Sequence, residues 1–135
     1  MIDRNFIDTN ILVYLYSVDE PTKSNIAKDI FARGNSIIST QVLNEFSNIL
    51  IKKYKQNAIN IIQAINEIEK IVYVATISNE TIKLALNLKS VYGYSYYDSL
   101  IIASALETEC NILITEDLHS NHLIENRLFI KNPFE

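Results

Sequence analysis

The sequence predicts an α/β protein: a three-layer sandwich in which a mostly parallel central sheet of about five short strands is flanked by helices. Short runs rich in isoleucine and leucine alternate along the chain with longer segments whose apolar residues recur at helical spacing. Strands that are separated by helices pair in parallel and are covered on both faces. The 135 residues include only two glycines and two prolines, so we expect one domain over residues 1–135 without long flexible linkers.

The predicted strands and helices follow one another in a regular order. Apolar runs place the strands at residues 5–8, 36–39, 72–75, 112–115 and 128–131. Helical spacing and end signals place helices at residues 10–16, 21–33, from Thr40, from Asn57, from Asn79 to about Gly93, and 97–106. The second helix has a proline at its start and a glycine past its end, while Thr40, Asn57 and Ser95 are candidate N-caps.

Composition and charge limit the possible classes of function. Apolar residues make up 48% of the chain and charged residues 21%, as in ordinary globular proteins. The lone Cys110 excludes an intrachain disulfide, the N-terminus lacks a signal-peptide pattern, and the apolar runs are shorter than a membrane span. We therefore expect a cytoplasmic protein without membrane contact. The net charge of −4 is unusual for a protein that binds nucleic acid through phosphate contacts alone, so an RNA substrate would require another source of positive charge.

Four acidic residues fall at equivalent places in the predicted topology. Asp8 ends the first strand, Glu45 lies about one turn into the helix after the second strand, and Asp117 follows the fourth strand. Asp98 lies in the first turn of the helix that leads back to the fourth strand. Because that helix runs antiparallel to the strand it precedes, its N-terminus lies over the carboxyl edge of the sheet. We therefore predict that the four carboxylates meet at this edge, where open α/β sheets place their sites.

Four clustered carboxylates would repel one another, and without a counter-charge at least one would be protonated near neutral pH. A hard divalent cation removes this conflict because Mg²⁺ prefers oxygen ligands and keeps several waters. Such ions activate water and stabilise the leaving oxygen in phosphodiester hydrolysis. We therefore expect Mg²⁺ or Mn²⁺ as the cofactor. The ion would also offset the repulsion between an acidic protein and phosphate.

Four segments resemble the motifs of PIN domains, in the same order and over essentially the whole chain. They are residues 6–14 (FIDTNILVY), 42–46 (VLNEF), 96–105 (YYDSLIIASA) and 114–118 (ITEDL). The last segment, with the late Asn132-Pro133-Phe134, resembles the ending of many VapC-type toxins. The glycine that commonly follows such an ending is absent, and Asn121 is a candidate for the left-handed backbone that glycine would adopt.

The resemblance implies a metal-dependent endoribonuclease, the toxin of a type II toxin–antitoxin pair, which hydrolyses RNA with metal-activated water. The catalytic metal ligands that it implies are Asp8, Glu45, Asp98 and Asp117. The residues that it implies as hydrogen-bonding supports of these ligands are Thr9, Asn10 and Thr115. Besides the RNA substrate, it implies a cognate antitoxin and a homodimer as partners.

Other functions remain open on the sequence. A PIN-like fold also suits a housekeeping RNA-processing enzyme, a structure-specific DNA nuclease or a non-catalytic interaction module. Each acid taken singly is explained as well by a helix cap, a helix dipole or a turn. A haloacid-dehalogenase site requires a second aspartate where Asn10 stands, and a receiver domain requires an aspartate after the third strand, where residues 76–78 are Thr-Ile-Ser.

Three other groups of residues allow two interpretations each. Tyr92, Tyr94, Tyr96 and Tyr97 either stack on unpaired bases or pack within the protein or a dimer, and packing is the commoner case. The run Lys52-Lys53-Tyr54-Lys55 either follows an RNA backbone or is a solvated helix end. We expect His119 and His122 to be surface residues rather than metal ligands, and Cys110 to be buried and inert.

Overall fold

The computed structural model describes residues 3–135, so residues 1 and 2 of the predicted domain lie outside the described residues. The strands are β1 (Asn5–Ile7), β2 (Ser36–Ser39), β3 (Tyr73–Ala75), β4 (Ile112–Ile114), β5 (Leu123–Ile124) and β6 (Leu128–Lys131). The helices are α1 (Thr9–Leu15), α2 (Pro21–Ala32), α3 (Thr40–Lys52), α4 (Ala58–Glu69), α5 (Asn79–Tyr92) and α6 (Tyr96–Glu107). None of these helices is long and apolar enough to cross a membrane.

The central sheet has the strand order β3-β2-β1-β4-β6-β5. All neighbouring strands pair in parallel except β5, which is antiparallel to β6. The predicted α/β class with a mostly parallel sheet is therefore confirmed. The sequence analysis missed β5, because a strand of two residues carries no periodic signal. Both edge strands are short, since β3 has three residues and β5 has two.

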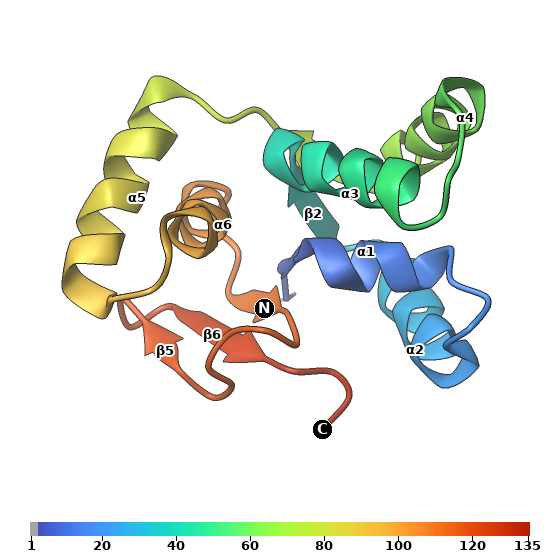
Figure 1. Ribbon diagram of the computed structural model, residues 1–135. Coiled ribbons are helices and arrows are strands. Elements are labelled where there is room, and N and C mark those ends of the chain that lie inside the picture. The colour runs from blue at the N-terminus through green and yellow to red at the C-terminus, as the bar shows by residue number, and fades with distance from the viewer. Residues whose placement is uncertain (1–2) are drawn as a thin grey trace.

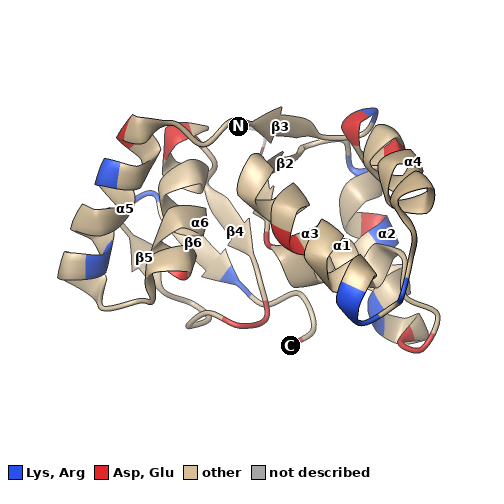
Figure 2. Ribbon diagram, turned by 45° about the horizontal axis from the view of Figure 1, so that its top comes forward, with Lys and Arg blue, Asp and Glu red and all other residues tan. Residues whose placement is uncertain are grey.

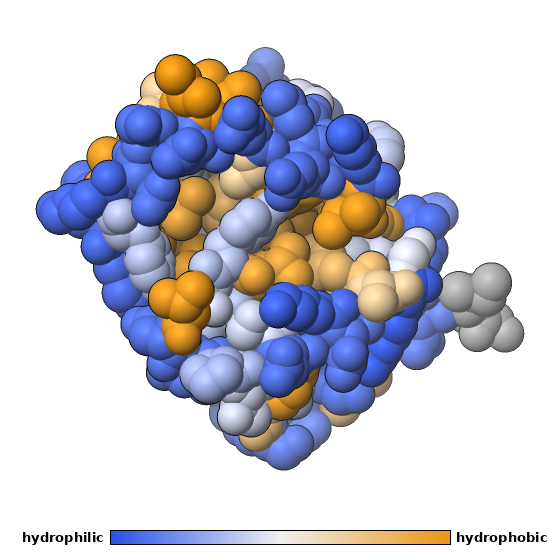
Figure 3. All heavy atoms as spheres, turned by 90° about the vertical axis from the view of Figure 1, so that its right-hand side faces the viewer, coloured by the Kyte–Doolittle hydropathy of each residue, from blue (hydrophilic) through white to orange (hydrophobic). Residues whose placement is uncertain are grey.

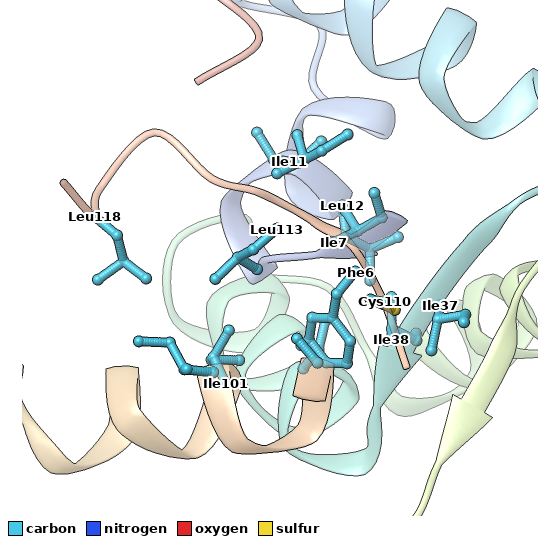
Figure 4. Close-up of a cluster of buried hydrophobic side chains, with 14 of the residues drawn as sticks. Phe6, Ile7, Ile11, Leu12, Ile37, Ile38, Ile101, Cys110, Leu113 and Leu118 are labelled. Carbon is cyan, nitrogen blue, oxygen red and sulfur yellow. The ribbon is translucent and has the colours of Figure 1, made fainter. Parts of the chain in front are cut away.

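The core lies between the sheet and the helices that cover it. The side chains of β1 and β2 are buried along their whole length. The apolar helix α6 is buried from Ser99 to Leu106, because α5 covers the side of α6 that faces away from the sheet (Figure 1). Phe6, Leu113 and Ile101, from β1, β4 and α6, lie in one buried cluster (Figure 4). This packing fixes the strand ends from which the acidic residues project.

Local signals set the helix ends. Asn57, Ser78 and Ser95 each accept a hydrogen bond as N-caps. The prediction that Thr40 caps the third helix is wrong. Ser39, the last residue of β2, accepts the hydrogen bond from the Val42 amide at 3.3 Å, because β2 passes into α3 without a loop.

Asn121 has a φ angle of 66°, so the expectation that it adopts the left-handed backbone is confirmed. Thr40 has a different role from the one predicted, since its hydroxyl accepts a hydrogen bond from the Ile77 amide at 3.1 Å.

Truncation of a buried side chain in the sheet tests the assigned core. Leu113 on β4 is 0% exposed, so Leu113→Ala should lower the free energy of unfolding by about 2–5 kcal/mol through lost burial and a residual cavity. The matched control is Ile59→Ala on α4, where the side chain is 68% exposed and the change should be within about 0.5 kcal/mol. Urea denaturation followed by circular dichroism measures both, and equal losses would contradict the assignment.

Candidate active site

The four acidic residues line one cavity of about 200 Å³ at the carboxyl edge of the parallel strands. Asp8 follows β1, Glu45 lies on α3, Asp98 lies in the first turn of α6, and Asp117 lies in the loop after β4. The cavity is completed by Thr9, Asn10, Ile49, Tyr97 and Ile101. Four segments that are distant in sequence therefore contribute one carboxylate each to the same hollow.

Asp8 is the most buried of the four acids, with 8% of its surface exposed. Its Oδ1 accepts a hydrogen bond from the Thr9 amide at 2.7 Å, and its Oδ2 accepts one from the Thr115 hydroxyl at 2.7 Å. Asp8 is thus the N-cap of α1 and also lines the acidic cavity. Burial raises the pKa of Asp8 to about 6, against the lowering effect of its two hydrogen bonds.

Glu45 is half-buried and is held from two sides. Its Oε1 accepts hydrogen bonds from Gln41 Nε2 at 3.1 Å and from the Thr9 hydroxyl at 3.4 Å. Burial raises the pKa of Glu45, and the nearby charge of Asp98 acts in the same direction. Gln41 Nε2 also donates to the Tyr97 carbonyl at 3.1 Å, which connects α3 to α6. The sequence analysis did not single out Gln41, although it lies one helical turn before Glu45 on the same face.

Asp117 is tied to both α1 and Thr115. Its Oδ2 accepts a hydrogen bond from Asn10 Nδ2, and its amide donates to the Thr115 hydroxyl at 3.2 Å. The same Thr115 hydroxyl donates to Asp8, so one side chain positions two of the four acids. Burial raises the pKa of Asp117, and the adjacent Glu116 charge adds to this effect.

Asp98 differs from the other three acids in its contacts. Its amide donates to the Ser95 hydroxyl at 3.2 Å, which fixes the start of α6. Among the residues that the structure describes, no donor forms a hydrogen bond with its carboxylate. The Asp98 side chain is therefore free to bind a ligand in the cavity.

A lysine side chain, Lys23, lies beside the loop that carries Asp117, in a cluster that the sequence analysis missed. Lys23 Nζ on α2 is 3.0 Å from Glu116 Oε2 and donates to the Tyr14 hydroxyl at 3.3 Å. The Tyr14 hydroxyl donates to Glu116 Oε1, and the Tyr14 ring packs edge-on against Phe134. These contacts anchor the loop that carries Asp117. No local sequence pattern links these four residues, because each comes from a different segment.

Comparison with known families decides the classification of the chain. The PIN domain family model matches residues 6–123. The chain belongs to the PIN domain family. The match extends from β1 to the start of β5 and so includes all four acids.

Solved structures with the same fold include three from bacterial toxin–antitoxin systems. A toxin–antitoxin complex from Klebsiella pneumoniae has a TM-score of 0.71 and 23% identity, with 97% of this chain and 98% of that chain covered. Mycobacterium tuberculosis VapC20, a toxin that cleaves the sarcin–ricin loop, has a TM-score of 0.67, 18% identity and coverages of 81% and 86%. VapBC2 from Rickettsia felis, bound to a DNA fragment from its promoter, has a TM-score of 0.62, 18% identity and coverages of 95% and 97%. Comparison with curated proteins gave no match.

The chemistry of the donor set in this PIN domain fits a hard divalent cation. Four carboxylates line the cavity, and no lysine, arginine or histidine is among its lining residues. Within residues 3–135, however, no three His, Cys, Asp or Glu side chains lie close enough together to hold one ion directly. A bound ion would therefore take some of its ligands from water, as Mg²⁺ commonly does.

The remaining sequence expectations have mixed outcomes. Cys110 is buried and His119 is exposed, as expected. His122 was expected at the surface, but this is wrong: it is half-buried, and its Nδ1 lies 2.7 Å from the Tyr94 hydroxyl. The physical reason is that the loop after β4 packs against the end of α5, where the Tyr92 ring also contacts His122. Tyr92 and Tyr94 therefore have packing roles.

The raised pKa of Asp8 predicts a pH-dependent stability. Because the folded pKa of about 6 exceeds the ordinary value of 3.8, the ionised carboxylate destabilises the fold, and this cost appears as pH rises through that window. In EDTA at pH 7, the free energy of unfolding of Asp8→Asn should therefore be up to about 3 kcal/mol higher than that of the parent protein. The gain should shrink to about 1 kcal/mol at pH 4.5.

Urea denaturation at both pH values measures this difference. Asp29→Asn, an exposed change on α2, is the control that should alter stability at neither pH. An Asp8→Asn protein no more stable than the parent at pH 7 would show that the Asp8 charge carries no such cost.

Proposed function

We propose that this PIN domain is a metal-dependent endoribonuclease that acts as the toxin of a toxin–antitoxin pair. The observation that carries the proposal is the meeting of four carboxylates in one small cavity at the sheet edge. In this proposal Mg²⁺ or Mn²⁺ is held by Asp8, Glu45, Asp98 and Asp117, by some of them only through bound water. When bound, the ion supplies positive charge for the phosphodiester and activates water for hydrolysis.

Side chains around the cavity orient its carboxylates and leave them without a cationic partner among the lining residues. Thr115 contacts both Asp8 and Asp117, Asn10 holds Asp117, and Thr9 contacts Glu45. These hydrogen bonds restrict the carboxylates before any cation arrives, which lowers the entropy lost on binding. Because the pKa of Asp8 is raised towards neutrality, binding of a cation should also displace a proton from the site.

The cleavage test uses Asp98→Asn, since the Asp98 carboxylate has no hydrogen-bond partner among the described residues and its loss should leave the fold intact. Changes next to a metal ligand commonly cost 10–100-fold in activity or affinity, so loss of a ligand should lower cleavage by at least about 100-fold. Cleavage of an end-labelled single-stranded RNA pool in Mg²⁺ measures the effect, and Asp29→Asn should cleave like the parent. Calorimetry should show Mg²⁺ binding to the parent and weaker binding to Asp98→Asn.

Several outcomes separate this proposal from its rivals. Full cleavage in EDTA, or by Asp98→Asn, would remove the metal-dependent mechanism. Faster cleavage of branched or structured DNA than of RNA would identify a DNA nuclease with the same site. Absence of Mg²⁺ binding at millimolar concentration, together with absence of cleavage, would indicate a non-catalytic module.

We also propose a cytoplasmic protein that forms a homodimer and is held inactive by an antitoxin. Toxin–antitoxin complexes among the structures of this fold support the antitoxin. A groove of about 290 Å³ between α1, α3 and α4 offers a place for it (Figure 3). Its lining combines apolar Val13, Leu50 and Ala64 with the rings of Tyr16 and Tyr54. Figure 3 shows apolar residues inside a hollow on this side, bordered by hydrophilic ones.

Co-expression with the product of the adjacent gene tests the antitoxin. Expression of the chain alone should stop growth, and co-expression should restore it. Tyr16→Ala removes a ring that is 36% exposed in the groove, so it should weaken rescue and reduce co-purification about tenfold. Val18→Ala, at a 93% exposed residue outside the groove lining, should change neither. Growth arrest by Asp98→Asn would separate toxicity from cleavage.

A further inference from the structure

One face of α3 joins the acidic cavity to two neighbouring hollows. Gln41, Asn44, Glu45, Asn48 and Lys52 are spaced by three and four residues, so they lie along one side of the helix. Glu45 stands in the middle of this α3 face, and cationic residues follow where the helix ends (Figure 2).

The three hollows adjoin one another, because each shares lining residues with the next. Towards the end of α3, the acidic cavity shares Asn10 and Ile49 with a hollow of about 420 Å³. In the other direction it shares Glu45 and Tyr97 with a second hollow of about 420 Å³. The two outer hollows also share Asn48, and Glu45 lies between Asn44 and Lys52 along the helix. The carboxylates therefore lie beside an open path along α3, and a chain-like ligand can extend from them towards either end of the helix.

The end of the path near the C-terminus of α3 is cationic on one wall. Lys52 and Lys53 line this hollow with Tyr54, and neither lysine forms an ion pair among the described residues. Asp19 and Glu20 line the same hollow from the loop between α1 and α2. An anionic ligand would therefore be attracted to the α3 wall and repelled from the opposite one.

The other end of the path has groups that suit unpaired bases. Tyr97 is 66% exposed and lines both the acidic cavity and the adjoining hollow. Asn44 and Asn48 line the same hollow, and their side-chain amides have no hydrogen-bond partner among the described residues. Exposed aromatic rings stack on bases, and free amides can bind base edges. The Tyr97 hollow thus reaches the start of α3 and the lysine hollow reaches its end, with Glu45 between them along the helix.

We propose that a single strand of RNA lies along the α3 face, with its phosphates on Lys52 and Lys53 on one side of the cleavage point and an unpaired base stacked on Tyr97 on the other. This inference rests on the proposed ribonuclease function and adds the path of the substrate. The lysines supply positive charge that the net-acidic chain lacks at the carboxylates. Tyr97 supplies a stacking contact that suits any base, and the two asparagines supply the amides that can select one.

RNA binding can be measured apart from cleavage in the Asp98→Asn background. The probe is a fluorescein-labelled pool of random 12-nucleotide RNAs, and the measurement is fluorescence anisotropy over a range of salt concentrations. The charge variant is Lys52→Gln with Lys53→Gln. Its matched control is Lys83→Gln with Lys89→Gln, which removes equal charge from α5 on another part of the molecule (Figure 2).

Loss of two phosphate contacts should weaken binding by about 25-fold at 0.1 M salt and reduce the slope of log affinity against log salt by about 1.4. The α5 control should keep the parent's affinity and slope. Tyr97→Ala should weaken binding roughly tenfold with the slope unchanged, because stacking is uncharged, and Tyr97→Phe should bind like the parent.

Equal affinities of the two lysine double variants, or no binding of RNA by the Asp98→Asn parent, would overturn the proposed path and leave the lysine hollow to a protein partner. If the Lys52→Gln and Lys53→Gln changes leave the RNA affinity unaltered while the unmodified enzyme still cleaves RNA, the ribonuclease function stands and the path is wrong. If the lysine and tyrosine variants behave as expected but the unmodified protein never cleaves, the path stands and the nuclease proposal fails.

Discussion

The burial of the Asp8 carboxylate at the end of the central strand is the constraint on which the site depends. β1 pairs with β2 and β4 on its two sides, so the position of Asp8 is fixed by the most buried part of the sheet. Thr9 and Thr115 stabilise its charged form, but no cation contacts it within the described residues. Burial prevails over these two hydrogen bonds and raises its pKa. The folded chain therefore holds a buried carboxylate charge that no cationic side chain among the described residues offsets. This charge favours the binding of a divalent cation.

The parallel topology explains how the other acids reach this place. In a parallel sheet every strand ends at the same edge, and each helix that returns to the next strand begins near that edge. Asp117 follows β4, beside β1, while Asp98 begins the helix that returns to β4. Glu45 belongs to α3. This helix begins directly after β2, because Ser39 both ends the strand and caps the helix. Short connections thus keep each carboxylate close to the sheet edge.

The sequence predicted what depends on chain direction and periodicity, and it missed what depends on contacts between distant side chains. The α/β class and the shared edge of the four acids follow from strand and helix order. The choice of Ser39 over Thr40 as cap depended on where β2 ends, which propensity does not resolve, since both residues are good caps. The Lys23–Glu116 pair joins residues 93 positions apart, and His122 is covered by tyrosines of another segment, so neither has a local signature.

The short edge strands have a consequence for how copies of this protein can associate. A long exposed edge offers a row of unpaired amides and carbonyls that another strand can extend. Here β3 presents three residues at one border and β5 only two at the other, where the ladder has already turned antiparallel. Edges this short can pair with only a few residues of a strand from another copy. Copies of this chain should accordingly associate through side chains on helical surfaces. Substitutions on those surfaces should dissociate the assembly, while substitutions along the edge strands should be tolerated.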